Sequence, residues 1–124
     1  MNRYIFVIDD SSTIRLSVEM AIRELGYPVM QAENGQDALD KIAEIKKSGD
    51  EIALCICDIN MPVMNGIEFI TAFREVDKFT PLIILSTENQ QGIIQKGKNS
   101  GASGWIVKPF KTEDLLNVVR RFVK

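Results

Sequence analysis

The sequence contains no histidine, so its own side chains offer no imidazole as a general base, a metal ligand or a phosphate carrier. Any phosphohistidine that this chain meets must belong to a partner. No apolar run approaches the ~20 residues that span a bilayer, and the N-terminus lacks the long apolar core of a signal peptide. These absences argue against membrane insertion and predict a cytoplasmic protein.

Cysteine and net charge are also scarce. Cys55 and Cys57 are the only cysteines, two residues apart in an apolar run. Extended backbone at that spacing does not suit a disulfide, and no further ligands are present to complete a zinc site. We expect them to be two small buried apolar side chains. The net charge of −2 provides no basic surface for nucleic acid.

Apolar runs and amphipathic segments alternate along the 124 residues, which suit one domain, assigned to 1–124. The apolar runs are 4–8, 28–32, 52–57, 81–85 and 103–107. This alternation predicts βαβ units and an α/β fold with a doubly wound, five-stranded parallel sheet. For a sheet of this size we expect the flavodoxin-like (βα)5 arrangement with strand order 2-1-3-4-5.

Short polar residues indicate where the helices begin. Ser11 or Ser12 can cap the first helix, Asn34 the second and Thr112 the last, because such side chains accept hydrogen bonds from free backbone N–H groups. Gly26 suits the residue that ends the first helix.

The apolar run at 52–57 leads directly into a carboxylate, Asp58, as in a central strand covered on both faces. In a parallel sheet all carboxyl ends lie at one edge, where ligands bind. The polar residues expected at that edge are Asp9 and Asp10, Asp58, Ser86 and Lys108. Taken singly, each has a plainer explanation as a helix cap, a turn residue or a structural Asp58–Lys108 ion pair.

Crowded carboxylates repel one another and favour a bound cation. Hard oxygen ligands suit Mg²⁺, which combines carboxylates with phosphate oxygens. The Ser86 hydroxyl and the Lys108 ammonium add the donors that a transferring phosphoryl group needs. An Asp carboxylate can itself accept that group as an aspartyl-phosphate.

These motifs resemble those of response-regulator receiver domains over essentially the whole chain: Asp9-Asp10, Asp58 with Asn60-Met61-Pro62 and Gly66, Ser86, and Lys108-Pro109-Phe110. The stretches 58–66 and 101–110 are most similar to stand-alone chemotaxis regulators of the CheY type. The resemblance implies a phosphorylation-dependent switch of two-component signal transduction. Such a switch is a phosphoprotein and not an enzyme, with self-catalysed phosphorylation and dephosphorylation.

The resemblance also assigns roles around the metal. Asp58 matches the phosphoacceptor, Asp10 the direct Mg²⁺ ligand, and Asp9 a residue that acts mainly through water. Asn60 matches the position whose backbone carbonyl completes the ligand set. Asn60 and Glu88 occupy the positions that tune the lifetime of the aspartyl-phosphate.

Other matched residues would carry the signal. Ser86 matches the switch hydroxyl, and Lys108 matches the lysine that pairs with the phosphoacceptor before a Lys108–Pro109 bond that is usually cis. Trp105 matches the aromatic switch position. Ser86 stands where Thr is commoner and keeps the hydroxyl. Trp105 stands where Tyr or Phe is usual, and we expect its larger ring to be less fully buried.

The implied partners are a histidine kinase as phosphodonor, a phosphatase, and a downstream target such as the flagellar motor switch, all bound by a monomer. The sequence ends at Lys124 without an effector domain, so the output would be a binding event. In the family the output face is formed by the fourth helix, fifth strand and fifth helix. Here it would present Gln91, Gln95, Lys98, Trp105, Lys111, Asn117 and Arg120.

Three alternatives stay open. One is a receiver that acts as an intermediate in a phosphorelay. Another is a Mg²⁺-dependent phosphohydrolase with an aspartyl nucleophile, although such enzymes carry a second Asp where this chain has Asn60. The third is a flavodoxin-like cofactor binder, in which Asp9 and Asp10 would repel the FMN phosphate.

Overall fold

The computed structural model describes residues 2–88 and 90–123; Met1, Asn89, expected just after the fourth strand, and Lys124, expected to end the chain, lie outside the described residues. The strands are β1 (Arg3–Ile8), β2 (Val29–Ala32), β3 (Glu51–Cys57), β4 (Leu82–Ser86) and β5 (Gly104–Val107). The helices are α1 (Ser12–Ile22), α2 (Gly35–Lys47), α3 (Gly66–Val76), α4 (Gln91–Ser100) and α5 (Thr112–Phe122), with a short 3-10 turn, η1 (Arg23–Leu25), after α1.

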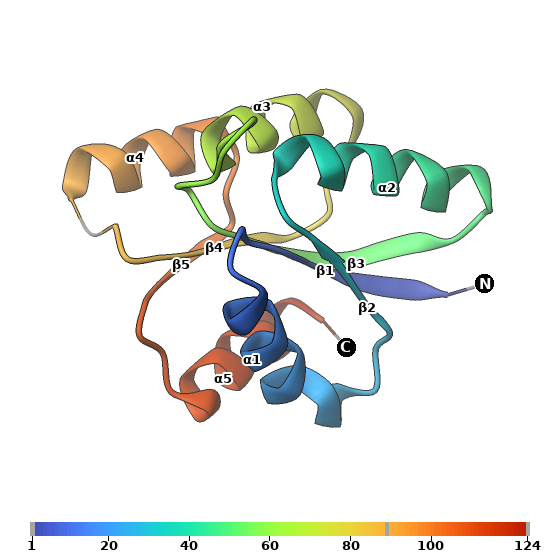
Figure 1. The fold of residues 1–124 in the computed structure, drawn as a ribbon, viewed down its shortest axis with the longest axis horizontal. Helices are drawn as coiled ribbons and strands as arrows, with labels where there is room; N and C mark the ends of the chain where they lie inside the picture. Colours follow the sequence, from blue (N-terminus) through green and yellow to red (C-terminus); the bar gives the residue numbers. More distant parts are fainter. Residues whose placement is uncertain (1, 89, 124) are drawn as a thin grey trace.

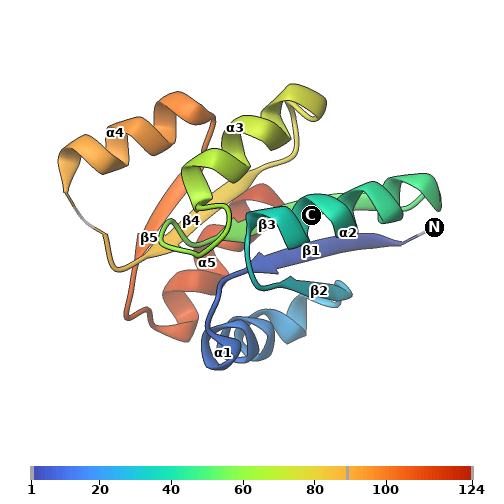
Figure 2. The same cartoon turned by 45° about the horizontal axis from the view of Figure 1, so that its top comes forward.

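All strand pairs are parallel, and the five strands follow the order β2-β1-β3-β4-β5. Helices α1 and α5 cover one face of the sheet, and α2, α3 and α4 cover the other (Figures 1 and 2). This confirms the doubly wound, flavodoxin-like fold. Within residues 2–88 and 90–123, no helix is long and apolar enough to cross a bilayer.

Strand β3 lies at the centre of the sheet and is buried on both faces. Leu54 and Ile56 pack in the apolar cluster under α1 and α5, whereas Cys55 and Cys57 point into the cluster under α2 and α3. Both cysteines are free, and burial raises the pKa of each thiol well above its usual range. They are buried packing residues, as the sequence predicted.

The first two helix starts agree with the sequence. The Ser11 hydroxyl accepts a hydrogen bond from the backbone N–H of Ile14 at 3.3 Å, and the Asn34 side chain accepts one from Asp37 at 2.8 Å. Gly26 has a left-handed backbone (φ 79°) and ends η1. The first helix therefore ends as a 3-10 turn at the glycine that the sequence indicated.

The prediction that Thr112 caps α5 is wrong. Thr112 is already the first helical residue, and Lys111 before it has an extended backbone (φ −92°, ψ 143°). In the described part of α5 the N-cap side chain makes no hydrogen bond. Glu113 and Asp114 lie in the first turn, where their charges complement the helix dipole, so this helix begins without a hydroxyl cap.

The loop between β3 and α3 contains a strained residue. Val63 has a φ of 67°, in the left-handed region, although it is β-branched. Its side chain is 82% exposed, so packing contributes little to offset a backbone cost of about 1–2 kcal/mol. The strain lies in the segment that joins Asp58 to α3.

Val63→Asn should raise the free energy of unfolding by about 1 kcal/mol, because asparagine tolerates the left-handed region. Urea unfolding followed by circular dichroism measures the change. Val76→Asn is the matched control: this valine is 69% exposed at the end of α3, and the change there should stay within about 0.5 kcal/mol. Equal effects of both substitutions would show that the Val63 backbone stores no strain.

Candidate functional site

Strand register brings Asp9 and Asp58 side by side. Ile8 of β1 pairs with Cys57 of β3, and each is followed by its aspartate. The Asp58 N–H donates to the Ile8 carbonyl at 2.9 Å, and the Asp9 N–H donates to the carbonyl of Ala32 at 3.0 Å. The backbone of both aspartates is therefore held by neighbouring strands.

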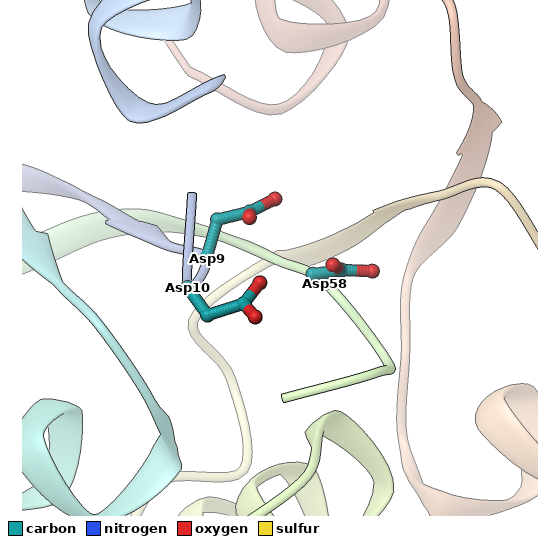
Figure 3. A group of neighbouring side chains, drawn as sticks. All are labelled: Asp9, Asp10 and Asp58. Carbon is teal, nitrogen blue, oxygen red and sulfur yellow. The ribbon is translucent and has the colours of Figure 1, made fainter. Parts of the chain in front are cut away.

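The carboxylates of Asp9, Asp10 and Asp58 form one group, in which each offers an oxygen within 4.8 Å of the others. Figure 3 shows them at the ends of β1 and β3, with their carboxyl groups pointing to the same side. Asp9 and Asp58 are only 3% and 7% exposed, whereas Asp10 faces solvent. Each buried carboxylate accepts one backbone N–H, from Ser11 at 2.9 Å and from Ile59 at 2.7 Å.

Lys108 supplies the opposite charge. Its Nζ lies 2.7 Å from Asp9 Oδ2 and 3.3 Å from Asp58 Oδ2, and its side chain is 11% exposed. Burial alone would lower the pKa of Lys108, but the hydrogen bond to Asp9 and the charges of Asp58 and Asp9 outweigh burial and raise that pKa. The expected pair with Asp58 is present, and Asp9 is a second and closer partner. The Lys108–Pro109 bond is cis, as the resemblance implied.

The sequence suggested that Ser86 directly follows β4. In the structure Ser86 is instead the last residue of that strand. It is fully buried, and its Oγ accepts the backbone N–H of Glu88 at 3.2 Å. Its carbonyl accepts the N–H of Lys108 at 2.8 Å. Ser86 thus connects the lysine to the loop before α4. Asn60 is exposed in the loop after Asp58.

Trp105 is half-buried. Its indole Nε1 donates to the Glu88 carbonyl at 3.2 Å. The other six residues proposed for the output face are all exposed: Gln91, Gln95, Lys98, Lys111, Asn117 and Arg120.

Sequence reasoning missed the contacts by which two residues support the aspartates. Arg15 of α1 donates from Nη1 to the Asp9 carbonyl at 2.6 Å and from Nε to Gln31 at 2.9 Å. Gly66 lies so close to Asp58 that a Cβ there would collide with the Asp58 carbonyl. Gly66 belongs to the motif that carries the resemblance, but the sequence did not show its contact with Asp58, and nothing in the helical pattern distinguishes Arg15 from a solvated residue.

The arrangement fits a hard divalent cation. Three carboxylates converge on one place, and one ammonium lies within hydrogen-bond distance of two of them. Because the negative charge exceeds the positive charge there, an additional cation with oxygen preference is favoured. Next to this cation position lies the buried Asp58 carboxylate with the Lys108 ammonium close to it. A carboxylate nucleophile with an adjacent positive charge is suited to accept an anionic phosphoryl group.

The comparison with known proteins agrees with this geometry. The family model of the response regulator receiver domain matches residues 5–120. The chain belongs to this family. Receiver domains are signalling switches, and the match begins within β1 and ends within α5, so it contains β2 to β5 completely and most of β1.

This receiver domain is similar to chemotaxis regulators over its full length. It is 30% identical to the chemotaxis protein CheY of Thermotoga maritima, with 100% of both chains covered. The solved structure of CheY4 from Vibrio cholerae superposes with a TM-score of 0.86 at 38% identity, covering 99% of this chain and 100% of that one. The sensor histidine kinase CheAY of Helicobacter pylori is 36% identical over 97% of this chain and 15% of that protein.

The Lys108 pair should make stability fall at alkaline pH. Because the folded pKa of Lys108 is raised, its contribution is fully present below the ordinary lysine value of about 10.4 and is lost as pH rises through the folded pKa. Urea unfolding between about pH 8 and about pH 11 should therefore show a steeper loss in the native protein than in Lys108→Met.

At neutral pH, Lys108→Met should cost about 3–5 kcal/mol, since it leaves two buried carboxylates without their cation. Lys98→Met, at an exposed position of α4, is the control and should keep both the native stability and the native alkaline slope. An alkaline slope in Lys108→Met as steep as in the native protein would contradict the assignment of that slope to Lys108.

Proposed function

We propose that this receiver domain is a phosphorylation-dependent switch of a two-component chemotaxis system. It accepts a phosphoryl group on Asp58 from the phosphohistidine of a partner kinase and signals by altered partner binding. The observation that carries the proposal is the buried Asp58 carboxylate, held by its strand and its neighbours, with the Lys108 ammonium 3.3 Å away. The full-length similarity to chemotaxis regulators supports the chemotaxis role and a place in the cytoplasm.

Mg²⁺ fits the carboxylate group, and its proposed ligands are Asp10 directly, Asp9 mainly through water, Asp58, and the backbone carbonyl of Asn60. Bound there, the ion would offset the negative charge of the phosphoryl oxygens and of the carboxylates. The support for this choice is that the carboxylates of Asp9, Asp10 and Asp58 offer oxygen atoms within 4.8 Å of one another.

The transfer step needs only groups that the site contains and a partner's imidazole. An Asp58 carboxylate oxygen attacks the phosphorus, the P–N bond of the phosphohistidine breaks, and the imidazole leaves with that electron pair and takes a proton from solvent. Lys108 is placed to contact an oxygen of the transferred group. Because the Lys108 ammonium lies between Asp9 and Asp58, it can shift toward Asp58 as negative charge develops on the phosphoryl oxygens there.

The signal would reach the output face through Ser86. In the resting structure its hydroxyl accepts the Glu88 N–H, so a turn toward a phosphoryl oxygen would release that loop. The loop leads into α4, whose exposed side chains belong to the proposed output face. A downstream target such as the motor switch would read the change there, and a phosphatase would end it.

The other sequence-based alternatives have less support. Asn60 cannot provide the second carboxylate of a phosphohydrolase, and it is exposed. Three carboxylates at the strand ends repel the phosphate of a flavin. A relay role would use the same Asp58 chemistry and differ only in passing the phosphoryl group to a partner's histidine.

Incubation with acetyl phosphate and Mg²⁺ should add one phosphoryl group, measured by intact mass. Asp58→Asn should abolish the addition because it removes the nucleophile, and omission of Mg²⁺ should lower it by at least about tenfold, corresponding to 1.4 kcal/mol of lost stabilisation. Asp40→Asn, at an exposed position of α2, is the control and should be modified like the native protein. Full modification of Asp58→Asn would disprove the assignment of Asp58 as phosphoacceptor.

A further inference from the structure

Trp105 connects three parts of the molecule. It lies in β5, where it pairs with Ile84 of β4. Its indole Nε1 donates to the Glu88 carbonyl in the loop between β4 and α4. Its ring reaches α4, which lies over this side of the sheet (Figure 1).

The ring meets α4 at a glycine. A methyl group on Gly97 would lie 2.8 Å from Cζ3 of Trp105 and 2.8 Å from Cδ1 of Ile84, closer than carbon atoms pack. The Ile84 contact involves the end of a flexible side chain, which can rotate. The indole is rigid, so it can make room only by moving as a whole.

Glycine weakens a helix relative to alanine, so its position in α4 calls for a physical reason. Gly97 is buried under the indole, which supplies one. Gly92 on the same helix is exposed, and apart from its chain neighbours and the helix's own backbone no atom of the described residues lies within 4 Å of the place its Cβ would take. The two glycines of α4 therefore differ in burial and in the side chains they face: Gly97 lies against Trp105 and Ile84, whereas Gly92 faces open space.

The indole also contacts Glu88, in the loop that is proposed to respond to phosphorylation of Asp58. Glu88 donates its N–H to the Ser86 hydroxyl at 3.2 Å and accepts the Trp105 N–H at 3.2 Å. A movement of Ser86 removes one hydrogen bond of Glu88 and leaves the other to the indole. The ring and the switch hydroxyl are therefore linked through a single residue.

We infer that Gly97 is a positioning residue: because it has no side chain, it leaves the space in which the Trp105 ring lies between α4 and the Glu88 carbonyl. This space, lined by Gly97 and the Glu88 carbonyl, is called the seat of Trp105. Through the ring held there, the state of Asp58 is passed to α4. A larger aromatic residue than usual is thereby matched by a missing side chain on the facing helix. The second part of the inference rests on the proposed phosphorylation of Asp58; the seat itself does not.

The single tryptophan of the sequence reports on the seat without any added label. In the unphosphorylated protein, Gly97→Ala should shift Trp105 emission to the red and make it more accessible to acrylamide, because the ring is displaced toward solvent. Gly92→Ala is the control and should keep the native spectrum and a native or higher thermal midpoint. A native spectrum in Gly97→Ala would overturn the seat.

Two double variants identify the contact that matters. Gly97→Ala with Ile84→Val removes only the clash with Cδ1, so its emission should stay red-shifted; a return to the native spectrum would overturn the inference. Gly97→Ala with Trp105→Phe removes the outer ring edge, so its thermal midpoint should equal or exceed that of Trp105→Phe alone. A midpoint lowered as much as by Gly97→Ala in the native background would also overturn it, and this test remains valid if Gly97→Ala folds poorly.

Acetyl phosphate with Mg²⁺ then separates the seat from the proposed function. Intact mass should show Gly97→Ala modified to the same extent as the native protein, while the emission change that accompanies modification is lost. A preserved emission change in modified Gly97→Ala would overturn the role of the seat in transmission. If neither protein is modified, the proposed function fails, and the red shift of the resting Gly97→Ala protein still decides the seat.

Discussion

The contact of one ammonium with two buried carboxylates is the interaction on which this site depends. Lys108 lies between Asp9 and Asp58, and all three side chains are almost completely excluded from water. Charges in such a place are costly unless they are paired and hydrogen-bonded. Each carboxylate here has both the lysine and one backbone N–H as partners. The site can therefore hold negative charge in a dry setting and still accept more positive charge from solvent on the exposed Asp10 side.

The sheet makes that contact possible. Asp9 and Asp58 follow paired residues of β1 and β3, and Lys108 follows a residue of β5 that pairs with Ser86. Because β3 is buried on both faces, a shift of Asp58 would disturb packing on either side of the sheet. The close approach of Gly66 to the Asp58 carbonyl adds a further restriction at the start of α3. Asp58, the proposed acceptor, is thus held firmly, and in the proposed switch the change would pass through the loop at Glu88 and the ring of Trp105.

Sequence reasoning could predict the fold and the location of the site for one physical reason. Strands covered on both faces are continuous apolar runs, and in a parallel sheet their carboxyl ends share an edge, so Asp58 and Lys108 could be assigned to the same place. Contacts that depend on side-chain reach between elements could not be predicted. The closer contact of Lys108 with Asp9, the support from Arg15 and the seat at Gly97 are of this kind. The start of α5 at Thr112 was mispredicted because a hydroxyl that suits a cap is equally compatible with the first helical turn.

The central claim is that Asp58, among all the carboxylates and hydroxyls at this edge, receives the phosphoryl group. Borohydride reduces an acyl phosphate to an alcohol, which leaves a permanent mark that peptide mass spectrometry can locate. After treatment with acetyl phosphate and Mg²⁺, the account predicts the alcohol at residue 58 and unchanged Asp9, Asp10 and Ser86. A reduced residue at position 9 or 10, or a stable phosphate on Ser86 with residue 58 unaltered, would contradict it.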